Sequence, residues 1–210
     1  MKKVYFIRHG ESEGNAGPIR QTKETPLTKK GKSQASIVAE RCVKLPLEFI
    51  VCSSMNRAKE TAEIILGKIS KPIEYSDLFI ERRRPSEVLG KPKNDPAALE
   101  AEKEIEEKFQ IPGFKFSDEE NFEDLKRRAK KALEYLERRP EETILVVTHG
   151  FFMRIIMAYV VFGDKLTGEE CVRFIQKFHM ENTGITVLGY DGKSNSPWWL
   201  WIWNDHAHLD

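Results

Sequence analysis

The feature that most constrains the fold of this sequence is a regular alternation of short apolar runs with longer segments of helical periodicity. Continuous apolar runs of four residues suit strands that are buried on both faces of a mainly parallel sheet. They occupy residues 4–7, 49–52, 144–147 and 185–188, with a weaker one at 73–75. Helical spacing of apolar residues follows at 29–44, 58–65, 121–139 and 150–162. The pattern predicts a three-layer α/β/α sandwich with a mainly parallel central sheet.

One segment interrupts this alternation. Residues 82–120 are rich in charge, contain four prolines and include one predicted helix at 96–108. Segments of this length without regular strands are usually functional or disordered. We therefore expect a single domain over residues 1–210, with 82–120 as a cap-like insertion lying over one edge of the sheet.

Composition excludes several classes of protein. The 210 residues carry 34 Lys and Arg against 33 Asp and Glu, a net charge of +1, so we expect no broad basic surface and no nucleic-acid partner. No apolar run approaches the roughly 18 residues of a membrane span, and the first one is too short for a signal-peptide core. Three widely spaced cysteines form neither a disulfide framework nor a zinc pattern, which favours a cytoplasmic location.

Histidine and arginine residues follow three of the expected strands. Arg8 and His9 end the first, Arg57 lies in the opening turn of the helix after the second, and His149 with Gly150 ends the run at 144–147. The carboxyl ends of parallel strands share one edge of a sheet, where ligands usually bind. These side chains are therefore predicted to converge, beside helix N-termini that add backbone donors.

Such a convergence is suited to phosphoryl transfer. Arg8 and Arg57 offer planar forks that match phosphate oxygens, and nearby arginines depress the pKa of an imidazole so that it stays neutral and nucleophilic. A second imidazole, when protonated, can stabilise charge on the transferred group. The natural reaction passes through a phosphohistidine and needs a carboxylic acid to protonate the leaving alkoxide.

The sequence Arg8-His9-Gly10-Glu11-Ser12 resembles the signature of the histidine phosphatase superfamily, the phosphoglycerate mutase-like proteins. The resemblance covers most of the chain, with blocks in the family order. After the signature and Asn15, these are residues 27–31 with Gln34 and Ala35, then Ser53, Arg57, Ala58, Thr61 and Ala62, then 148–150, and finally 182–184 with Thr186 and 204–209. One such block would be weak, and their common order makes the assignment specific.

The resemblance implies a role for each matching position. His9 would be the nucleophile that becomes phosphorylated, and Arg8, Arg57 and His149 would hold the phosphoryl group. Asn15 would be an additional donor. Ser12 and Gly150 complete the predicted phosphate-binding set.

The general acid is less well defined by the resemblance. Glu81 fits best, because it stands in the Leu-x-Glu type of context that the family uses. The Gly and Glu-Gly that often follow this acid are absent, so Glu87 is a rival. Residues 82–84 are three consecutive arginines instead. Such a run is usually a solvated charged surface; the alternative is a cationic rim that favours substrates with more than one negative group.

Three functions remain open. The first is a metal-independent phosphomonoesterase that acts through a phosphohistidine on His9. The second is a cofactor-dependent phosphoglycerate mutase, although residues 16–26 lack the Phe-Thr-Gly-Trp type of segment of such mutases. The third is an inactive phosphate-binding module, which the retained His9 and Arg57 disfavour.

The same residues suggest which molecules the chain binds. We expect a phosphorylated small molecule as substrate, no cofactor, and no metal, because no histidines or acids have close ligand spacing. The tryptophan-rich run at 198–203 is apolar on both faces. It predicts a buried strand or a subunit contact, which leaves a homodimer open.

Overall fold

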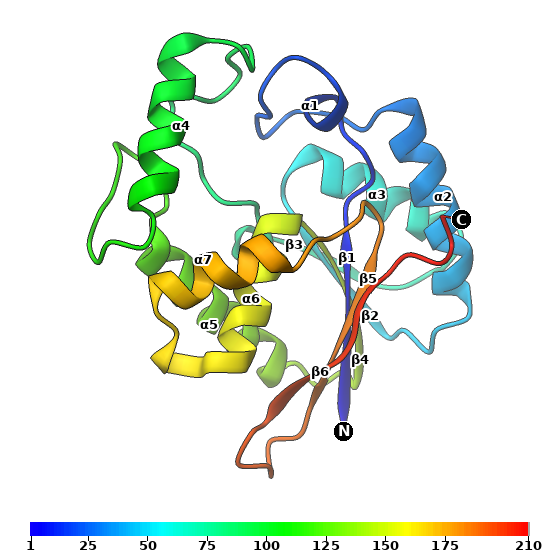
Figure 1. Cartoon of the computed structure of the whole chain (residues 1–210). Helices are drawn as coiled ribbons and strands as arrows, with labels where there is room; N and C mark the ends of the chain where they lie inside the picture. Colours follow the sequence, from blue (N-terminus) through cyan, green and yellow to red (C-terminus); the bar gives the residue numbers. More distant parts are fainter. Residues whose placement is uncertain (210) are drawn as a thin grey trace.

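The computed structural model describes residues 1–209 and contains a six-stranded sheet with helices on both faces (Figure 1). The strands are β1 (Lys2–Arg8), β2 (Phe49–Ser53), β3 (Ile73–Ser76), β4 (Thr143–Thr148), β5 (Ile185–Tyr190) and β6 (Trp198–Asp205). Their order is β3-β2-β4-β1-β5-β6, and β3, β2, β4 and β1 are parallel to one another. Strand β5 is the exception, since it runs antiparallel to both of its neighbours, β1 and β6. The predicted mainly parallel sheet is confirmed.

Helices form the two outer layers. They are α1 (Glu13–Ala16), α2 (Lys29–Val43), α3 (Asn56–Leu66), α4 (Pro96–Lys108), α5 (Phe122–Arg138), α6 (Gly150–Phe162) and α7 (Gly168–Lys177), with 3₁₀ turns at Asp77–Phe79 and Gly163–Lys165. Figure 1 shows α2 and α3 on one face of the sheet and α5, α6 and α7 on the other. The predicted three-layer sandwich is therefore confirmed. Helix α7 was not predicted, although Thr167 and Glu170 form a capping box at its start.

Side chains of the strands pack against the helices on both faces of the sheet, which explains why the strands are apolar throughout. Successive residues of a strand point to opposite faces. In β1, Val4 and Phe6 enter the cluster that contains α5 and α6, whereas Ile7 enters the cluster that contains α2 and α3. All three side chains are fully buried.

The tryptophan-rich strand β6 differs from the prediction of a buried strand. It lies at the end of the sheet, and Leu200, Trp201 and Ile202 are 36%, 48% and 41% exposed. The position at the sheet edge leaves one side of β6 without a neighbouring strand within residues 1–209, so an apolar sequence did not imply burial. The alternative, a subunit contact, stays a prediction.

The segment 82–120 leaves the sheet after β3 and returns at α5. Its helix α4 stands apart from the sheet, at the end of the molecule where α1 lies (Figure 1). The segment is joined to the loop after α1, since the Arg20 amide donates to the Lys91 carbonyl and the Lys93 amide donates to that of Pro18. Through these contacts, the segment 82–120 and the loop after α1 face each other at the end of the molecule where the strands have their carboxyl ends.

Two further observations bear on the class of protein. Within residues 1–209, no helix has the length and apolar character that crossing a bilayer requires. Cys42, Cys52 and Cys171 are free and buried.

Candidate active site

Three strand ends bring the predicted histidines and arginines together. Because β4 lies between β1 and β2, the residues that follow these strands share one edge of the sheet. The His9 amide donates to the Thr148 carbonyl at 2.9 Å, and the imidazole rings of His9 and His149 lie 5.1 Å apart between centroids. Arg57, in the first turn of α3, reaches the same point.

His9 is buried and held in one tautomer. Its Nδ1 lies 2.7 Å from the Gly10 carbonyl oxygen, which can only accept, so Nδ1 carries the proton and Nε2 carries the lone pair. Arg57 Nε donates to that Nε2 at 3.2 Å. Burial, followed by the charges of Arg57 and Arg8, holds the pKa of His9 well below its usual value. His9 therefore presents a neutral, nucleophilic nitrogen.

His149 is fully buried beside it. Its Nε2 lies 2.7 Å from the hydroxyl of Ser53, which itself accepts a hydrogen bond from the Met55 amide. When the neutral ring carries its proton on Nδ1, Nε2 accepts the hydrogen bond of the Ser53 hydroxyl. Within residues 1–209 this Nδ1 has no hydrogen-bond partner. Burial and Arg57 lower the pKa of His149, so the ring is neutral before a phosphoryl group arrives.

The two arginines carry the positive charge of the site. Burial lowers the pKa of Arg57 to about 10, so the side chain is still charged at pH 7. Arg8 donates to the Met180 carbonyl, while its buried Nε has no partner within the described chain. Gly150 allows this placement, because a Cβ there would lie 3.1 Å from Cδ and Nε of Arg8.

Other residues of the resembling blocks support the loop that carries His9. The Gly10 amide donates to the Thr61 hydroxyl at 3.1 Å, and the Glu11 amide donates to Gln34 at 2.9 Å. Gly31 packs so closely that a Cβ would lie 1.9 Å from the Glu11 carbonyl oxygen. These positions belong to the blocks that resemble the family, but the resemblance implied no role for them.

Glu81 lies at the N-terminus of α6, next to the histidine and arginine cluster. Its carboxylate accepts hydrogen bonds from the amides of Phe151 and Phe152, at 3.2 and 3.0 Å, and from that of Arg82 at 3.0 Å. The negative charge of Glu81 raises the pKa of both Arg8 and Arg57, against the lowering effect of burial. The structure thus brings Glu81 to the same site.

The structure places Glu87 elsewhere. Its carboxylate accepts a hydrogen bond from the Ser117 hydroxyl at 2.7 Å, which is the first cause of its lowered pKa. It is exposed and does not line the pocket described below. Glu87 is therefore a poor candidate for a general acid.

Ser12 and Asn15 form a capping box at the start of α1. The Ser12 hydroxyl donates to Asn15 Oδ1 at 3.0 Å, and the Asn15 amide donates back to Ser12 Oγ at 3.3 Å. Ser12 is fully buried, and its proton is used in this cap. Within residues 1–209, the side-chain nitrogen of Asn15 makes no hydrogen bond and keeps its donor capacity.

A pocket of about 560 Å³ opens above these residues. Arg57, Glu81 and Phe151 form its inner part. The adjoining Arg8, His9 and His149 do not line the pocket but are counted with this part, because Arg57 contacts His9 and the two histidine rings are neighbours. The outer part comes from the loop after α1 and from the segment 82–120. The lining residues are Gly14, Arg20, Gln21, Thr22, Lys23, Met55, Arg57, Ile80, Glu81, Arg82, Arg83, Arg84, Val88, Leu89, Lys93, Glu102, Asp118 and Phe151.

The three consecutive arginines have different environments. Arg82 is 5% exposed, pairs with Glu119 at 2.6 Å and lies over the ring of Phe109. The interpretation of a solvated run is therefore wrong for Arg82. Arg83 is exposed, whereas Nη1 of Arg84 is buried without a partner among residues 1–209.

The residues around the pocket offer no evident metal ligand set. Within residues 1–209, His, Cys, Asp and Glu side chains form no group of three or more that could hold a metal ion. What the arrangement offers chemically is a neutral imidazole nucleophile, two guanidinium groups, an unpaired imidazole Nδ1 and a carboxylate.

Known proteins resemble the chain over its whole length. A protein of Photorhabdus laumondii named probable phosphoglycerate mutase GpmB is 29% identical over 218 residues, with 100% of this chain and 96% of that protein covered. The structure of Bacillus stearothermophilus YhfR has a TM-score of 0.83 and 27% identity, and a phosphoserine phosphatase mutant of Entamoeba histolytica in complex with phosphoserine has 0.77 and 25%; both alignments cover 100% of each chain.

The family itself is shown by a direct match. Residues 4–205 match the family described as "Histidine phosphatase superfamily (branch 1)". This match includes residues of every strand of the sheet and all the residues of the candidate site, so the resemblance noted from the sequence blocks is confirmed. The chain belongs to the histidine phosphatase superfamily.

Proposed function

We propose that the chain is a metal-independent phosphomonoesterase that works through a phosphohistidine on His9. The observation that carries this proposal is the fixed tautomer of His9, whose Nε2 lone pair lies beside the guanidinium of Arg57. A nucleophile that is neutral by burial, with cations beside it, is what attack on a phosphate dianion requires.

In the first step, Nε2 of His9 attacks phosphorus and the bond from phosphorus to the ester oxygen breaks. Arg8, Arg57 and Nδ1–H of His149 would donate to the phosphoryl oxygens, with Asn15 as a further donor. The leaving oxygen takes a proton from the carboxylic acid form of Glu81, which releases the alcohol. This proton prevents expulsion of a strongly basic alkoxide.

In the second step, water attacks the phosphorus atom of the phosphohistidine. Glu81, now a carboxylate, takes a proton from that water, and the bond between phosphorus and Nε2 breaks. Inorganic phosphate leaves, and both His9 and Glu81 return to their starting protonation states. The net reaction is hydrolysis of one phosphomonoester.

A phosphoglycerate mutase remains the second candidate, since a 29% identical relative carries that name. A mutase would return the phosphoryl group to a different hydroxyl rather than to water. The loop at 16–26 favours the phosphatase, because it lacks the Phe-Thr-Gly-Trp type of segment. It contributes Arg20, Gln21, Thr22 and Lys23 to the pocket instead.

The pocket lining supports a proposal about the substrate. Seven of its residues are Arg or Lys and three are acidic. Arg84 adds a buried nitrogen without a partner in the described chain. We therefore propose a small phosphomonoester that carries a second negative group, which the cations of the outer pocket would attract.

The decisive experiment measures phosphate release from p-nitrophenyl phosphate in the presence of EDTA. The proposal predicts turnover that EDTA does not reduce. Absence of turnover with any phosphoester would contradict both enzymatic functions, and loss on adding EDTA would contradict the metal-independent mechanism. Interconversion of 2- and 3-phosphoglycerate, primed by 2,3-bisphosphoglycerate and faster than phosphate release, would favour the mutase.

Paired substrates test the second negative group. 3-Phosphoglycerate and glycerol 3-phosphate differ chiefly in a carboxylate, so the proposal predicts a higher kcat/KM for the former. Arg84→Gln should reduce that preference and leave glycerol 3-phosphate almost unaffected. Equal kcat/KM values for both substrates in the wild type would contradict the substrate proposal alone.

A further inference from the structure

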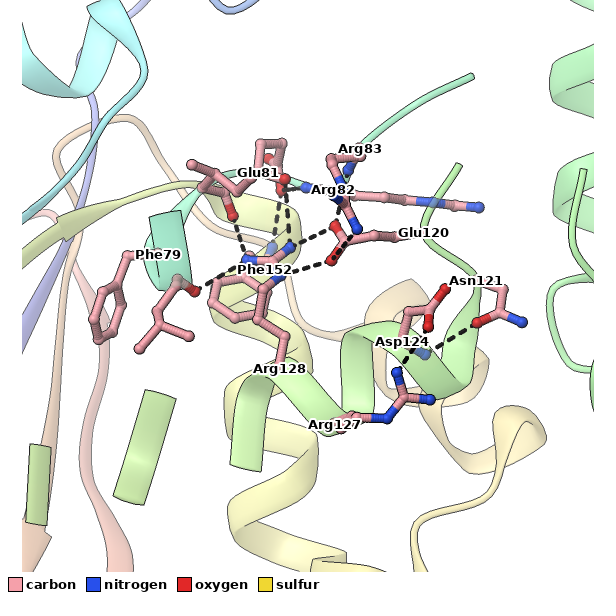
Figure 2. Close-up of polar contacts among 12 residues, drawn as sticks. Phe79, Glu81, Arg82, Arg83, Glu120, Asn121, Asp124, Arg127, Arg128 and Phe152 are labelled. Atoms are coloured by element: carbon pink, nitrogen blue, oxygen red, sulfur yellow. Dashed lines mark hydrogen bonds and ion pairs between the residues drawn. The ribbon is translucent and has the colours of Figure 1, made fainter. Parts of the chain in front are cut away.

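The side chain of Arg128, on α5, binds the backbone of the segment that carries Glu81. Its guanidinium donates to the carbonyl oxygens of Leu78 and Ile80 at 3.1 and 2.8 Å, and to that of Glu81 at 3.4 Å (Figure 2). This segment has little regular structure, since it leaves the 3₁₀ turn after β3 and enters the insertion. Arg128 therefore supplies fixation that the local chain does not.

Glu120 fixes Arg128 in turn. The two side chains form a two-bond fork, with Nε to Oε1 and Nη2 to Oε2 both at 2.8 Å. Both are buried, with 11% and 3% of the side chains exposed. Glu120 also accepts the Arg83 amide at 3.0 Å, so it closes the base of the insertion. Planar forks of this kind are geometrically specific.

Arg128 also contacts the other element that holds Glu81. The centre of its guanidinium lies 3.7 Å from the centre of the Phe152 ring, in α6. The amide of Phe152 is one of the donors to the Glu81 carboxylate. Arg128 thus touches both the backbone that carries Glu81 and the residue that binds its carboxylate, as Figure 2 shows.

We infer that the Arg128–Glu120 pair positions Glu81 for proton transfer. Arg128 acts as a positioning residue, because its contacts are with the support of Glu81 and it does not line the pocket. The inference rests on the proposed role of Glu81 as general acid. A displacement of about 1 Å at a catalytic group can cost on the order of 100-fold in rate, so such support has a kinetic consequence.

The neighbouring Arg127 is a matched control. It lies on the same helix, but its side chain is 62% exposed, and among the described residues 1–209 it pairs only with Asp124, one turn away (Figure 2). A substitution of Arg127 removes the same charge from the same helix without touching the support of Glu81.

The test compares kcat/KM for two aromatic phosphomonoesters of similar size. Benzyl phosphate releases an alkoxide that needs a proton, whereas p-nitrophenyl phosphate releases a stable phenolate. kcat/KM reports only the steps up to alcohol release, so attack by water does not enter. Arg128→Met should lower the value for benzyl phosphate about 10- to 100-fold, and that for p-nitrophenyl phosphate less than about threefold. Arg127→Met should change neither.

A double-mutant cycle separates positioning of Glu81 from a general structural role. If Arg128 acts through Glu81, adding Arg128→Met to Glu81→Gln should change kcat/KM for benzyl phosphate less than about twofold. Arg128→Lys and Glu120→Gln carry the same comparison if Arg128→Met does not fold, because each keeps most of the buried volume while breaking the fork.

Two results would overturn the inference while leaving the proposed function intact. One is an equal loss on both substrates in every folded variant. The other is that Arg128→Met lowers kcat/KM for benzyl phosphate as much in the Glu81→Gln protein as in the wild type. A wild-type protein that hydrolyses neither phosphate would instead contradict the proposed function, so the two failures are distinguishable.

Discussion

The arginines of the inner and outer parts of the pocket differ in whether they are paired with a carboxylate. In the inner part, Arg57 is buried and Arg8 is half-buried, and within residues 1–209 neither forms an ion pair. In the outer part, Arg20 pairs with Glu102 and Arg82 pairs with Glu119. Unpaired buried cations cost free energy unless an anion arrives, so the inner part is built for a ligand. The paired cations of the outer part also fasten the insertion in place.

The comparison predicts the largest effect at the nucleophile of the inner part. His9→Ala should reduce kcat for p-nitrophenyl phosphate about a thousandfold or more, because no other group can carry the phosphoryl. Measuring phosphate release and searching for an acid-labile phosphoryl adduct checks this. An adduct that persists in His9→Ala would assign the nucleophile to another residue.

Glu81 should show a smaller and substrate-dependent effect. Glu81→Gln should lower kcat/KM for benzyl phosphate about 100-fold, which is within the usual range for a general acid, and that for p-nitrophenyl phosphate much less. Glu87→Gln is the matched control and should leave both unchanged. Selective loss in Glu87→Gln instead would move the acid to the insertion.

The outer part should respond in stability. Glu119→Gln leaves Arg82 buried without its charged partner, which should lower the free energy of unfolding by about 3 kcal/mol. Glu169→Gln breaks an exposed pair with Arg173 and should change the free energy of unfolding by less than about 1 kcal/mol. Urea unfolding of both variants measures the difference. Similar midpoints would show that the buried pair does not fasten the insertion.

The smallest expected effect is a dependence of stability on pH in the inner part. The pKa values of His9 and His149 are lowered in the folded chain, so below pH 6.5 the unfolded chain binds more protons. Stability is then full above that pH and decreases as the pH falls, by up to about 1.4 kcal/mol per pH unit for each histidine. Urea unfolding at pH 7.5 and 5.5 gives the change, and an NMR titration should show both rings neutral at pH 6. Protonation of either ring above pH 6.5 would contradict the buried, cation-flanked environment.

Local patterns were sufficient for much of the architecture. Helices α4 and α6 begin and end at the predicted residues 96–108 and 150–162, since a proline or a strand end marks each start. Helix α7 was not predicted, although the capping box of Thr167 and Glu170 marks its start in the sequence. For strand β6 the sequence predicted a buried strand or a subunit contact, and the buried strand was wrong, because composition does not determine where a strand lies in a sheet.

By itself, the sequence determined the family and the convergence of Arg8, His9, Arg57 and His149, because strand ends in a parallel sheet meet at one edge. Only the tertiary structure decided which glutamate accompanies them. Glu81 binds the start of α6, some 70 residues away, while Glu87 faces a serine of the insertion. The burial of Arg82 against Glu119 was likewise undetermined, since pairing over 37 residues depends on how the chain packs and not on any local period.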